Sequence, residues 1–275
     1  MNIHAWDAHC HADILWARDG EFETQYHRLR LGGISWSYAH NISSWRDYPA
    51  YWRHLERMCT ELAGRGLRFY YLVGIHPRCI PQDLERKRHL PQELGDELAD
   101  HLQNPLCRGL GELGLETGSE EEKKVFRRQL ELAASHISLG PKIGVHTPKK
   151  DKEDRTRSIL KVLGEYPQLQ EDILVDHVTA RTWSMVWEQG FMLGMTLQPG
   201  KCDLLEVHRV LDQEPRLQDR LIVNSDGATE MSGPFLQAVQ EWPDLDRSIW
   251  DKLFRSNAER FWGVQSHKAK SFSGS

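Results

Sequence analysis

The sequence predicts an α/β protein built as a single (β/α)8 TIM barrel, with a metal site at the carboxyl ends of the strands. Two observations support this fold. Short apolar runs end in polar residues at intervals close to one βα unit, about 31 residues, and the chain of 275 residues has the size of one such barrel. The polar ends fall at positions 11, 40, 76, 112, 146, 177, 198 and 226, and only the interval from 177 to 198 is short for a strand and a helix.

The apolar runs are expected to be the barrel strands. They are short and rich in β-branched and other apolar residues, as in strands that are covered on both faces. In the first half of the chain they occupy 5–9, 33–39, 69–75 and 109–113. In the second half they occupy 142–145, 173–176, 192–197 and 221–224.

The segments between most strands are expected to be outer helices. Apolar residues at three- and four-residue spacing indicate a helix over 52–62, and a second such segment over 125–133 follows Ser119 and three glutamates, which is typical of a helix start. The segment 78–91 carries prolines and a mixed-charge run. It is expected to be a solvated helix or a loop at the rim.

The chain is expected to form one domain over 1–264, because no Pro/Gly/Ser-rich linker, charge block or internal repeat divides it. Residues 265–275 are small, polar and poorly patterned, and are expected to be a flexible tail. A hydrophobic fraction of 39% and a charged fraction of 27% are ordinary for a globular protein, so the composition excludes a disordered chain.

Charge, termini and cysteines restrict the function classes. A net charge of −5 gives no global attraction for nucleic acid or for an anionic membrane. The first residues lack a basic region followed by an apolar stretch, and no apolar run reaches about 18 residues, so a cytoplasmic location without membrane contact is expected. Five cysteines without a Cys-x-x-Cys pair predict free thiols rather than disulfides or a structural zinc site.

His9 and His11 are candidate metal ligands. They lie two residues apart at the end of an extended run, where side chains alternate, so both imidazoles are expected on the same side. Cys10 then points the opposite way, and a small buried thiol is a better interpretation for it than a ligand. A lone His-x-His pair is weak evidence, but further ligand-type residues at later strand ends strengthen it.

Glu112 is a candidate ligand shared by two ions. A carboxylate in an apolar strand is costly unless it is paired or bound to a cation, and its two oxygens can bridge ions about 3.5–4 Å apart. A salt bridge to a buried arginine is the alternative. His146, His177 and Asp226 each end a later apolar strand and complete the candidate set. Imidazole with carboxylate favours two divalent ions, with zinc preferred and manganese, iron, nickel or magnesium as alternatives.

Three residues are expected to take part in catalysis. Glu112 holds the ions, and Asp226 is expected both to bind one ion and to accept the proton of the attacking water. His76, in Gly-Ile-His-Pro, is expected to contact substrate or stabilise developing charge, with capping of a loop as its alternative. Asp7 and Asp176 flank ligand histidines and are candidates for orienting them, although strand alternation would turn them away.

Four motifs resemble the TatD-like metal-dependent hydrolases of the amidohydrolase superfamily, across nearly the whole chain. They are Asp7-Ala8-His9-Cys10-His11-Ala12-Asp13, Gly74-Ile75-His76-Pro77, Gly111-Glu112-Leu113-Gly114-Leu115-Glu116 and Asn257-Ala258-Glu259-Arg260-Phe261-Trp262-Gly263. The resemblance implies a binuclear site. One ion would be held by His9, His11, Glu112 and Asp226, and the other by Glu112, His146 and His177.

The chain also departs from the family pattern, and resembles an uncharacterised branch of it. His146-Thr147-Pro148 stands where the family usually has H-x-R, so a phosphate-binding arginine is missing unless Lys149 or Lys150 replaces it. The family's usual T-D-x-P is replaced by Ser225-Asp226-Gly227-Ala228. Its usual H-x-F-S/G is replaced by Val175-Asp176-His177-Val178-Thr179. The metal ligands are retained, whereas the residues expected around the substrate differ.

The leading functional hypothesis is hydrolysis of a phosphoester, a phosphodiester first, by a hydroxide held between two metals. The substrate would be a small molecule or a nucleic acid, as for the deoxyribonucleases in the family, with Lys201 and the run Arg86-Lys87-Arg88 as candidate phosphate contacts. The negative net charge and the missing arginine argue against a nuclease. A hydrolase of small amides or esters and a non-catalytic metal-binding barrel are the alternatives. The sequence does not predict an oligomeric state.

Overall fold

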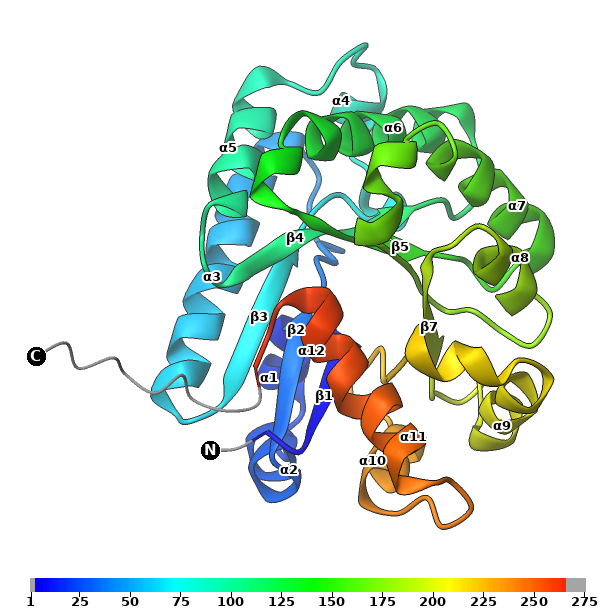
Figure 1. The fold of residues 1–275 in the computed structure, drawn as a ribbon. Helices are drawn as coiled ribbons and strands as arrows, with labels where there is room; N and C mark the ends of the chain where they lie inside the picture. The colour runs from blue at the N-terminus through cyan, green and yellow to red at the C-terminus, as the bar shows by residue number, and fades with distance from the viewer. Residues whose placement is uncertain (1–2, 266–275) are drawn as a thin grey trace, which may run out of the picture.

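The computed structural model describes residues 3–265 and confirms the predicted barrel. Its sheet has eight parallel strands in the order of the chain, β1 to β8. Figure 1 shows the strands arranged around the centre of the molecule, with helices outside them. The strands are β1 (Ala5–Cys10), β2 (Leu31–Ser35), β3 (Arg68–Val73), β4 (Cys107–Gly114), β5 (Lys142–His146), β6 (Ile173–Val175), β7 (Met192–Thr196) and β8 (Leu221–Asn224). Since all strands run in parallel, the polar residues that end them meet at one end of the barrel.

The barrel closes between β1 and the residues that follow β8. The Asp226 N–H donates to the His9 carbonyl at 2.8 Å, and the His11 N–H donates to the Gly227 carbonyl at 2.7 Å. The buried Asp7 carboxylate, on the other side of β1, accepts hydrogen bonds from the backbone N–H and the hydroxyl of Ser225. Closure therefore places three candidate ligands, His9, His11 and Asp226, side by side.

Helices follow the strands and cover the outside of the barrel (Figure 1). They are α1 (Ala12–Arg18), α2 (Phe22–Leu29), α3 (Tyr48–Gly64), α4 (Gln82–Glu85), α5 (Gln92–Leu102), α6 (Glu120–Ser135), α7 (Lys152–Leu163), α8 (Trp183–Glu188), α9 (Leu204–Gln213), α10 (Gly233–Gln240), α11 (Arg247–Asp251) and α12 (Asn257–Trp262). The predicted helix after Ser119 is confirmed as α6, because the Ser119 hydroxyl accepts the Glu122 N–H at 3.1 Å. The segment 78–91 contains the end of a short 3-10 turn and the short α4, as expected for the rim.

The amino-terminal end of the barrel is closed by α12. Trp262 packs edge-on against Trp36 with ring centroids 5.8 Å apart, and both belong to a buried cluster with Trp6, Leu72 and other inward-facing residues. The Asn257 side chain donates to the Leu221 carbonyl at 2.8 Å and so ties α12 to β8. This packing fills one end of the barrel, and the end that carries the polar residues is left for the site.

Strand β2 differs from its prediction. It begins at Leu31 and ends at Ser35, whereas 33–39 was expected. Leu31 and Gly32 pair with Ala5 and Trp6, and Gly32 is needed there because the Trp6 ring occupies the space of a side chain, 2.3 Å from an added Cβ. The prediction was wrong here because no pattern in the sequence around Gly32 shows that this glycine lies against an aromatic ring of the neighbouring strand.

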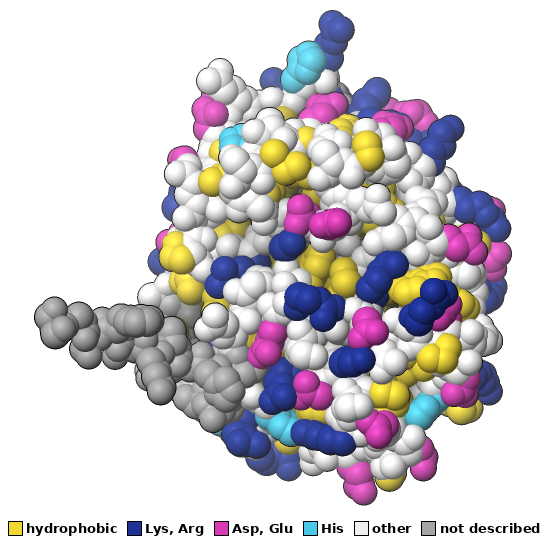
Figure 2. Space-filling model, in the orientation of Figure 1, with side chains coloured by type: hydrophobic (Ala, Val, Ile, Leu, Met, Phe, Trp, Pro, Cys, Tyr) yellow, Lys and Arg dark blue, Asp and Glu magenta, His cyan; other side chains and the backbone are white. Residues whose placement is uncertain are grey.

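On the face that Figure 2 shows, basic and acidic side chains are interspersed. This face therefore has no continuous basic surface of the kind that binds nucleic acid. No helix within residues 3–265 is long and apolar enough to cross a membrane. Of the expected tail, 265–275, only Gln265 lies among the described residues.

Candidate metal centre

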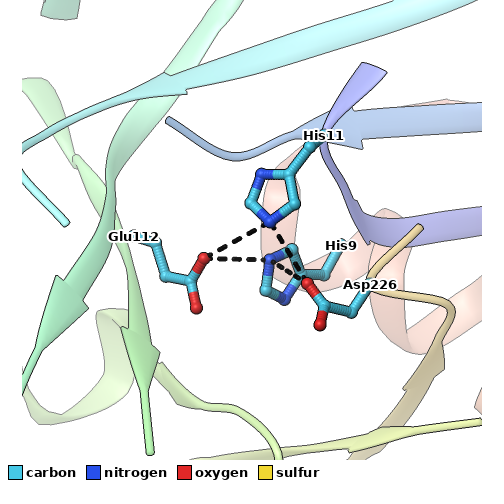
Figure 3. A group of neighbouring side chains, drawn as sticks. All are labelled: His9, His11, Glu112 and Asp226. Carbon is cyan, nitrogen blue, oxygen red and sulfur yellow. Dashed lines mark ion pairs between the residues drawn. The ribbon is translucent and has the colours of Figure 1, made fainter. Parts of the chain in front are cut away.

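Figure 3 shows four candidate ligands converging on one point. His9 lies in β1 and His11 directly follows it, while Glu112 comes from β4 and Asp226 from the loop after β8. Glu112 Oε2 lies 3.3 Å from His9 Nε2 and 3.7 Å from His11 Nε2, and Asp226 Oδ1 lies 3.4 and 3.2 Å from the same two nitrogens. Two carboxylate oxygens and two imidazole nitrogens therefore surround a space of the size that one cation requires.

The second oxygen of Glu112 faces another group of imidazoles. Glu112 Oε1 lies 2.7 Å from His146 Nδ1, 3.4 Å from His177 Nε2 and 3.6 Å from His76 Nε2. His146 ends β5, and His177 follows β6 after one intervening residue. The structure thus brings together all seven residues singled out from the sequence, with Glu112 between the two groups.

Hydrogen bonds assign the protons of three imidazoles. His9 Nδ1 lies 2.5 Å from Asp176 Oδ2, His11 Nδ1 lies 3.0 Å from the Trp36 carbonyl, and His177 Nδ1 lies 2.8 Å from the Thr196 hydroxyl. Burial lowers the pKa of His11 and His177, so these neutral rings carry the proton on Nδ1 and direct the Nε2 lone pair toward a carboxylate, a repulsive arrangement that a cation would relieve. Burial also lowers the pKa of His9, but Glu112 and Asp176 outweigh it and raise this pKa to about 9, so a cation would replace the proton on His9 Nε2. Among the described residues, the buried His9 Nε2 has no hydrogen-bond partner, so it is a donor atom available to such a cation.

His76 has the opposite proton arrangement. Its Nδ1 accepts the Arg78 backbone N–H at 3.0 Å, so the neutral ring carries its proton on Nε2. Burial lowers the pKa of His76 to about 4, which keeps the ring neutral near pH 7. His76 therefore presents an N–H donor, not a lone pair, to the cavity beside Glu112. The loop-capping role that was the alternative from sequence is present as well, since this bond begins a short 3-10 turn.

Glu112 is held as a carboxylate. Burial raises its pKa, but the neighbouring His76, His9 and His146 rings outweigh burial and hold the pKa well below its usual range. His146 has a second carboxylate partner, because its Nε2 lies 3.0 Å from Glu116 Oε2. Glu116 in turn pairs with Arg78 at 2.9 Å, and its pKa falls to about 2 against the effect of burial. A proton on Nε2 leaves His146 Nδ1 free to act as a ligand.

Asp176 and Asp7 have different roles, although the sequence suggested the same role for both. Asp176 does orient His9, because it follows β6 and escapes strand alternation. Asp7 lies within β1 and faces away from the site, where it accepts the Ser225 bonds and the Tyr26 hydroxyl at 3.0 Å, and burial raises its pKa to about 6. The orienting role suggested for Asp7 was therefore wrong. Cys10 is buried as predicted, with its Sγ 3.6 Å from the Ile34 carbonyl.

A buried chain of polar side chains links the two groups of ligands. Asn224 donates to Asp176 Oδ1 at 2.9 Å and accepts the Thr196 hydroxyl at 2.9 Å, and Thr196 accepts the His177 ring proton. Sequence reasoning missed Asn224 and Thr196, since each is an ordinary polar residue at a strand end. His177 and Asp226 also have positive φ, 57° and 47°, a conformation that non-glycine residues rarely adopt and that often marks functional sites.

We expect Asp176→Asn to lower the affinity for a divalent cation by about 10- to 100-fold, because His9 loses the acceptor that fixes its ring. The measurement is a competitive titration with a metal-sensitive chelator. Asp7→Asn is the matched control, a second buried aspartate, which touches no candidate ligand ring. It is expected to change thermal stability and to leave metal affinity within about twofold. Equal affinities of the wild type and Asp176→Asn would contradict this assignment.

A cavity of about 460 Å³ opens over the candidate ligands. Apart from the ligands themselves, the charged residues that line it are all basic: Arg78, Lys149, Lys152, Arg181 and Lys201. Lys201 pairs with Asp226 Oδ2, and burial lowers the pKa of Lys201 to about 8. Lys149 and Lys201 are thus brought to the site as the sequence suggested, whereas Lys150 and the run Arg86-Lys87-Arg88 do not line the cavity.

A parallel barrel with clustered histidines and carboxylates at its strand ends is typical of metal-dependent enzymes, hydrolases among them. Comparison with known proteins gives the family. Residues 6–232 match the TatD related DNase family, and the chain belongs to it. A curated relative, an uncharacterized metal-dependent hydrolase of Methanocaldococcus jannaschii, is 29% identical over 199 residues, which cover 70% of this chain and 72% of the relative.

Solved structures show the same fold. A TatD-like protein from Archaeoglobus fulgidus has a TM-score of 0.71 at 24% identity, covering 94% of this chain and 100% of its own. A β-aspartyl dipeptidase from Fervidobacterium islandicum has a TM-score of 0.67 at 12% identity, covering 98% of this chain and 77% of its own. At these identities the likeness concerns the fold. The protein is a TatD-family hydrolase, and its substrate has to be argued from the site.

Proposed function

We propose that the protein hydrolyses a phosphoester, most favourably a phosphodiester, with two divalent cations. The observation that supports the cations is the arrangement around Glu112, whose two oxygens face separate groups of imidazoles. The observation that supports an anionic substrate is the cavity wall, whose charged residues outside the ligand set are all basic. Both features suit a phosphoryl group, which is negatively charged before and during reaction.

One cation would be held by His9, His11, Glu112 and Asp226, and the other by Glu112, His146 and His177. These donors are imidazole nitrogens and carboxylate oxygens, which fit zinc best and also manganese, iron, nickel or magnesium. Bound cations would supply a water molecule of lowered pKa and neutralise charge on the phosphoryl oxygens. In this arrangement Glu112 is the residue that both ions share.

Asp226 is proposed to accept the proton of the attacking water. Its Oδ1 faces the His9 and His11 nitrogens, and its Oδ2 reaches the cavity, where it contacts Lys201. A carboxylate that both touches the ligand space and borders the cavity is within reach of a water on either side of it. The Lys201 ammonium holds the carboxylate in this orientation.

His76 is proposed to donate its Nε2 proton to a substrate oxygen on which negative charge develops. A neutral imidazole with a fixed N–H acts as such a donor, in contrast to the lone-pair rings around it. We expect His76→Ala to lower kcat by about 100-fold, the usual cost of one such donor, while two ions per chain remain bound. Elemental analysis and steady-state kinetics on the same preparation measure both. A loss of one ion together with activity would instead make His76 a ligand.

Two alternatives share the fold and the candidate ligands. A hydrolase of amides or other esters would use the same cations, and a non-catalytic barrel would bind them without turnover. The basic cavity favours the phosphoester over a neutral amide, because unpaired positive charge gives no advantage to an uncharged substrate. The proposal includes nucleic acid as one of the possible phosphodiester substrates.

The test is metal content of gently purified protein, combined with hydrolysis of bis(p-nitrophenyl) phosphate before chelation, after chelation and after metal is added back. Two ions per chain with turnover that metal restores are expected. Turnover of p-nitrophenyl acetate or of anilide substrates without turnover of the phosphodiester would replace this proposal by the amide or ester alternative. Bound metal without turnover of any of them would favour the non-catalytic barrel.

A further inference from the structure

Three lysines approach the cavity from two loops beside the metal centre. Lys149 lies between β5 and α7, Lys152 is the first residue of α7, and Lys201 lies between β7 and α9. Lys201 has Asp226 as its counter-ion. Within residues 3–265, no carboxylate forms an ion pair with Lys149 or Lys152, and no acceptor bonds the Lys149 ammonium. The two loops therefore carry positive charge that the protein itself leaves without a counter-charge.

The Lys149 ammonium lies against the tip of the other loop. Its Nζ is 3.6 Å from the position that a Cβ on Gly200 would occupy, and Gly200 has a φ of 77°. Gly200 directly precedes Lys201, so the two lysines border the same part of the cavity. The charge of Lys149 beside the loop that carries Lys201 would favour an anion bound between the two loops.

The loop that presents Lys149 is anchored to the metal centre. Lys152 is buried and donates to the Thr147 carbonyl at 2.9 Å and to its hydroxyl at 2.6 Å, while the Thr147 hydroxyl donates to the Asp176 carbonyl at 2.7 Å. Lys152 thus folds the loop back onto itself. Because Thr147 also directly follows His146, the start of the loop that carries Lys149 is tied to both groups of candidate ligands.

The remaining cations of the wall are already paired. Arg78 binds Glu116 at 2.9 Å, and the largely exposed Arg181 lies 3.6 Å from Glu153. The uncompensated charge is therefore concentrated at Lys149, since burial lowers the pKa of Lys152 to about 7. A cavity of about 460 Å³ falls within the range for small-molecule sites. It accommodates a small substrate with one group at the ligands and another at the lysines.

We propose that Lys149, flanked by Lys152 and Lys201, binds a second phosphate group of the substrate, so that the natural substrate is a small phosphoester that carries a further phosphate monoester. This inference rests on the proposed function, since it takes the first phosphate to react at the metal centre. The lysines would bind the second phosphate through charge-assisted hydrogen bonds without taking part in the reaction. Lys149 is then a specificity-determining residue.

The first test is direct binding of inorganic phosphate to the full chain, stripped of metal and freed of chelator, by isothermal titration calorimetry. Lys149→Gln is expected to weaken binding about tenfold, the effect of one lost charge-assisted contact. Lys150→Gln is the matched control, an exposed neighbour outside the cavity, and should bind phosphate as the wild type does. Unchanged affinity in Lys149→Gln, or no phosphate binding by the wild type, would overturn the subsite.

The second test compares two substrates of the metal-loaded protein, the p-nitrophenyl ester of thymidine 5′-phosphate with and without a 3′-phosphate. The wild type and Lys150→Gln should have a KM about tenfold lower for the 3′-phosphorylated ester, and Lys149→Gln should lose this preference. Equal KM values in the wild type would overturn the subsite while the phosphodiesterase stands. Cleavage of neither ester would instead remove the proposed function. A KM for a single-stranded oligonucleotide tenfold below that of the bisphosphate would overturn the assignment to a small substrate.

Discussion

Glu112→Gln is expected to reduce turnover of a phosphodiester by at least about a thousandfold and to lower metal content below one ion per chain. The glutamine keeps the volume of the side chain but removes the charge that both ion positions share. His9 and His11 face one of its oxygens, and His146 and His177 face the other, so its charge is shared by the two groups. The loss should therefore affect both ions together.

Elemental analysis and hydrolysis of bis(p-nitrophenyl) phosphate, measured on one preparation with zinc in excess, provide the test. Glu120→Gln is the matched control, an exposed glutamate on α6 whose substitution should leave both quantities unchanged. A far-ultraviolet circular dichroism spectrum like that of the wild type would establish that the barrel has formed. Turnover within tenfold of the wild type would show that Glu112 does not bridge the ions.

The metal ligands were predictable because each combines two local signals. An ionisable residue ends an apolar run, and such a residue needs a partner when the fold buries it, as it does for Glu112 and His146. Strand alternation then gives the side to which His9 and His11 point. These are properties of short segments, so they can be inferred from sequence without knowledge of the neighbours.

The partners of the ligands were not predictable in the same way. Asp176 reaches His9 across 167 residues of chain, and Asn224 reaches Asp176 across 48, so only the closed barrel brings them into contact. Glu116 was visible as the last residue of a motif, but its bond to His146 depends on how β4 and β5 pair. Asp7 was misassigned because the seam between β1 and the residues after β8 has no local pattern.

The proton on His76 illustrates what geometry adds to residue type. Five histidines surround the carboxylates, and residue type alone does not distinguish the metal ligands among them from a hydrogen-bond donor. The Arg78 backbone N–H occupies Nδ1 of His76, whereas acceptors occupy Nδ1 of His9, His11 and His177. The distinction arises because His76 begins a 3-10 turn at Pro77, while the other three have polar neighbours across the barrel.

Asp226→Asn is expected to lower turnover by at least about a thousandfold with a smaller loss of metal, because the amide keeps an oxygen for the ion but cannot accept a proton. It should also destabilise the metal-free protein. Lys201, with 13% of its side chain exposed, would lose its counter-ion, and an unpaired, largely buried ammonium costs about 2 kcal/mol or more. Urea unfolding and steady-state kinetics measure the two effects separately.

The double substitution Asp226→Asn/Lys201→Met separates charge pairing from catalysis. Methionine removes the uncompensated ammonium, so the free energy of unfolding should recover most of what Asp226→Asn loses. Turnover should stay low, because the proton acceptor is still absent. Asp244→Asn, an exposed aspartate, should change neither quantity. Recovery of turnover together with stability would mean that Asp226 acts only by neutralising Lys201, and the water would then need another base.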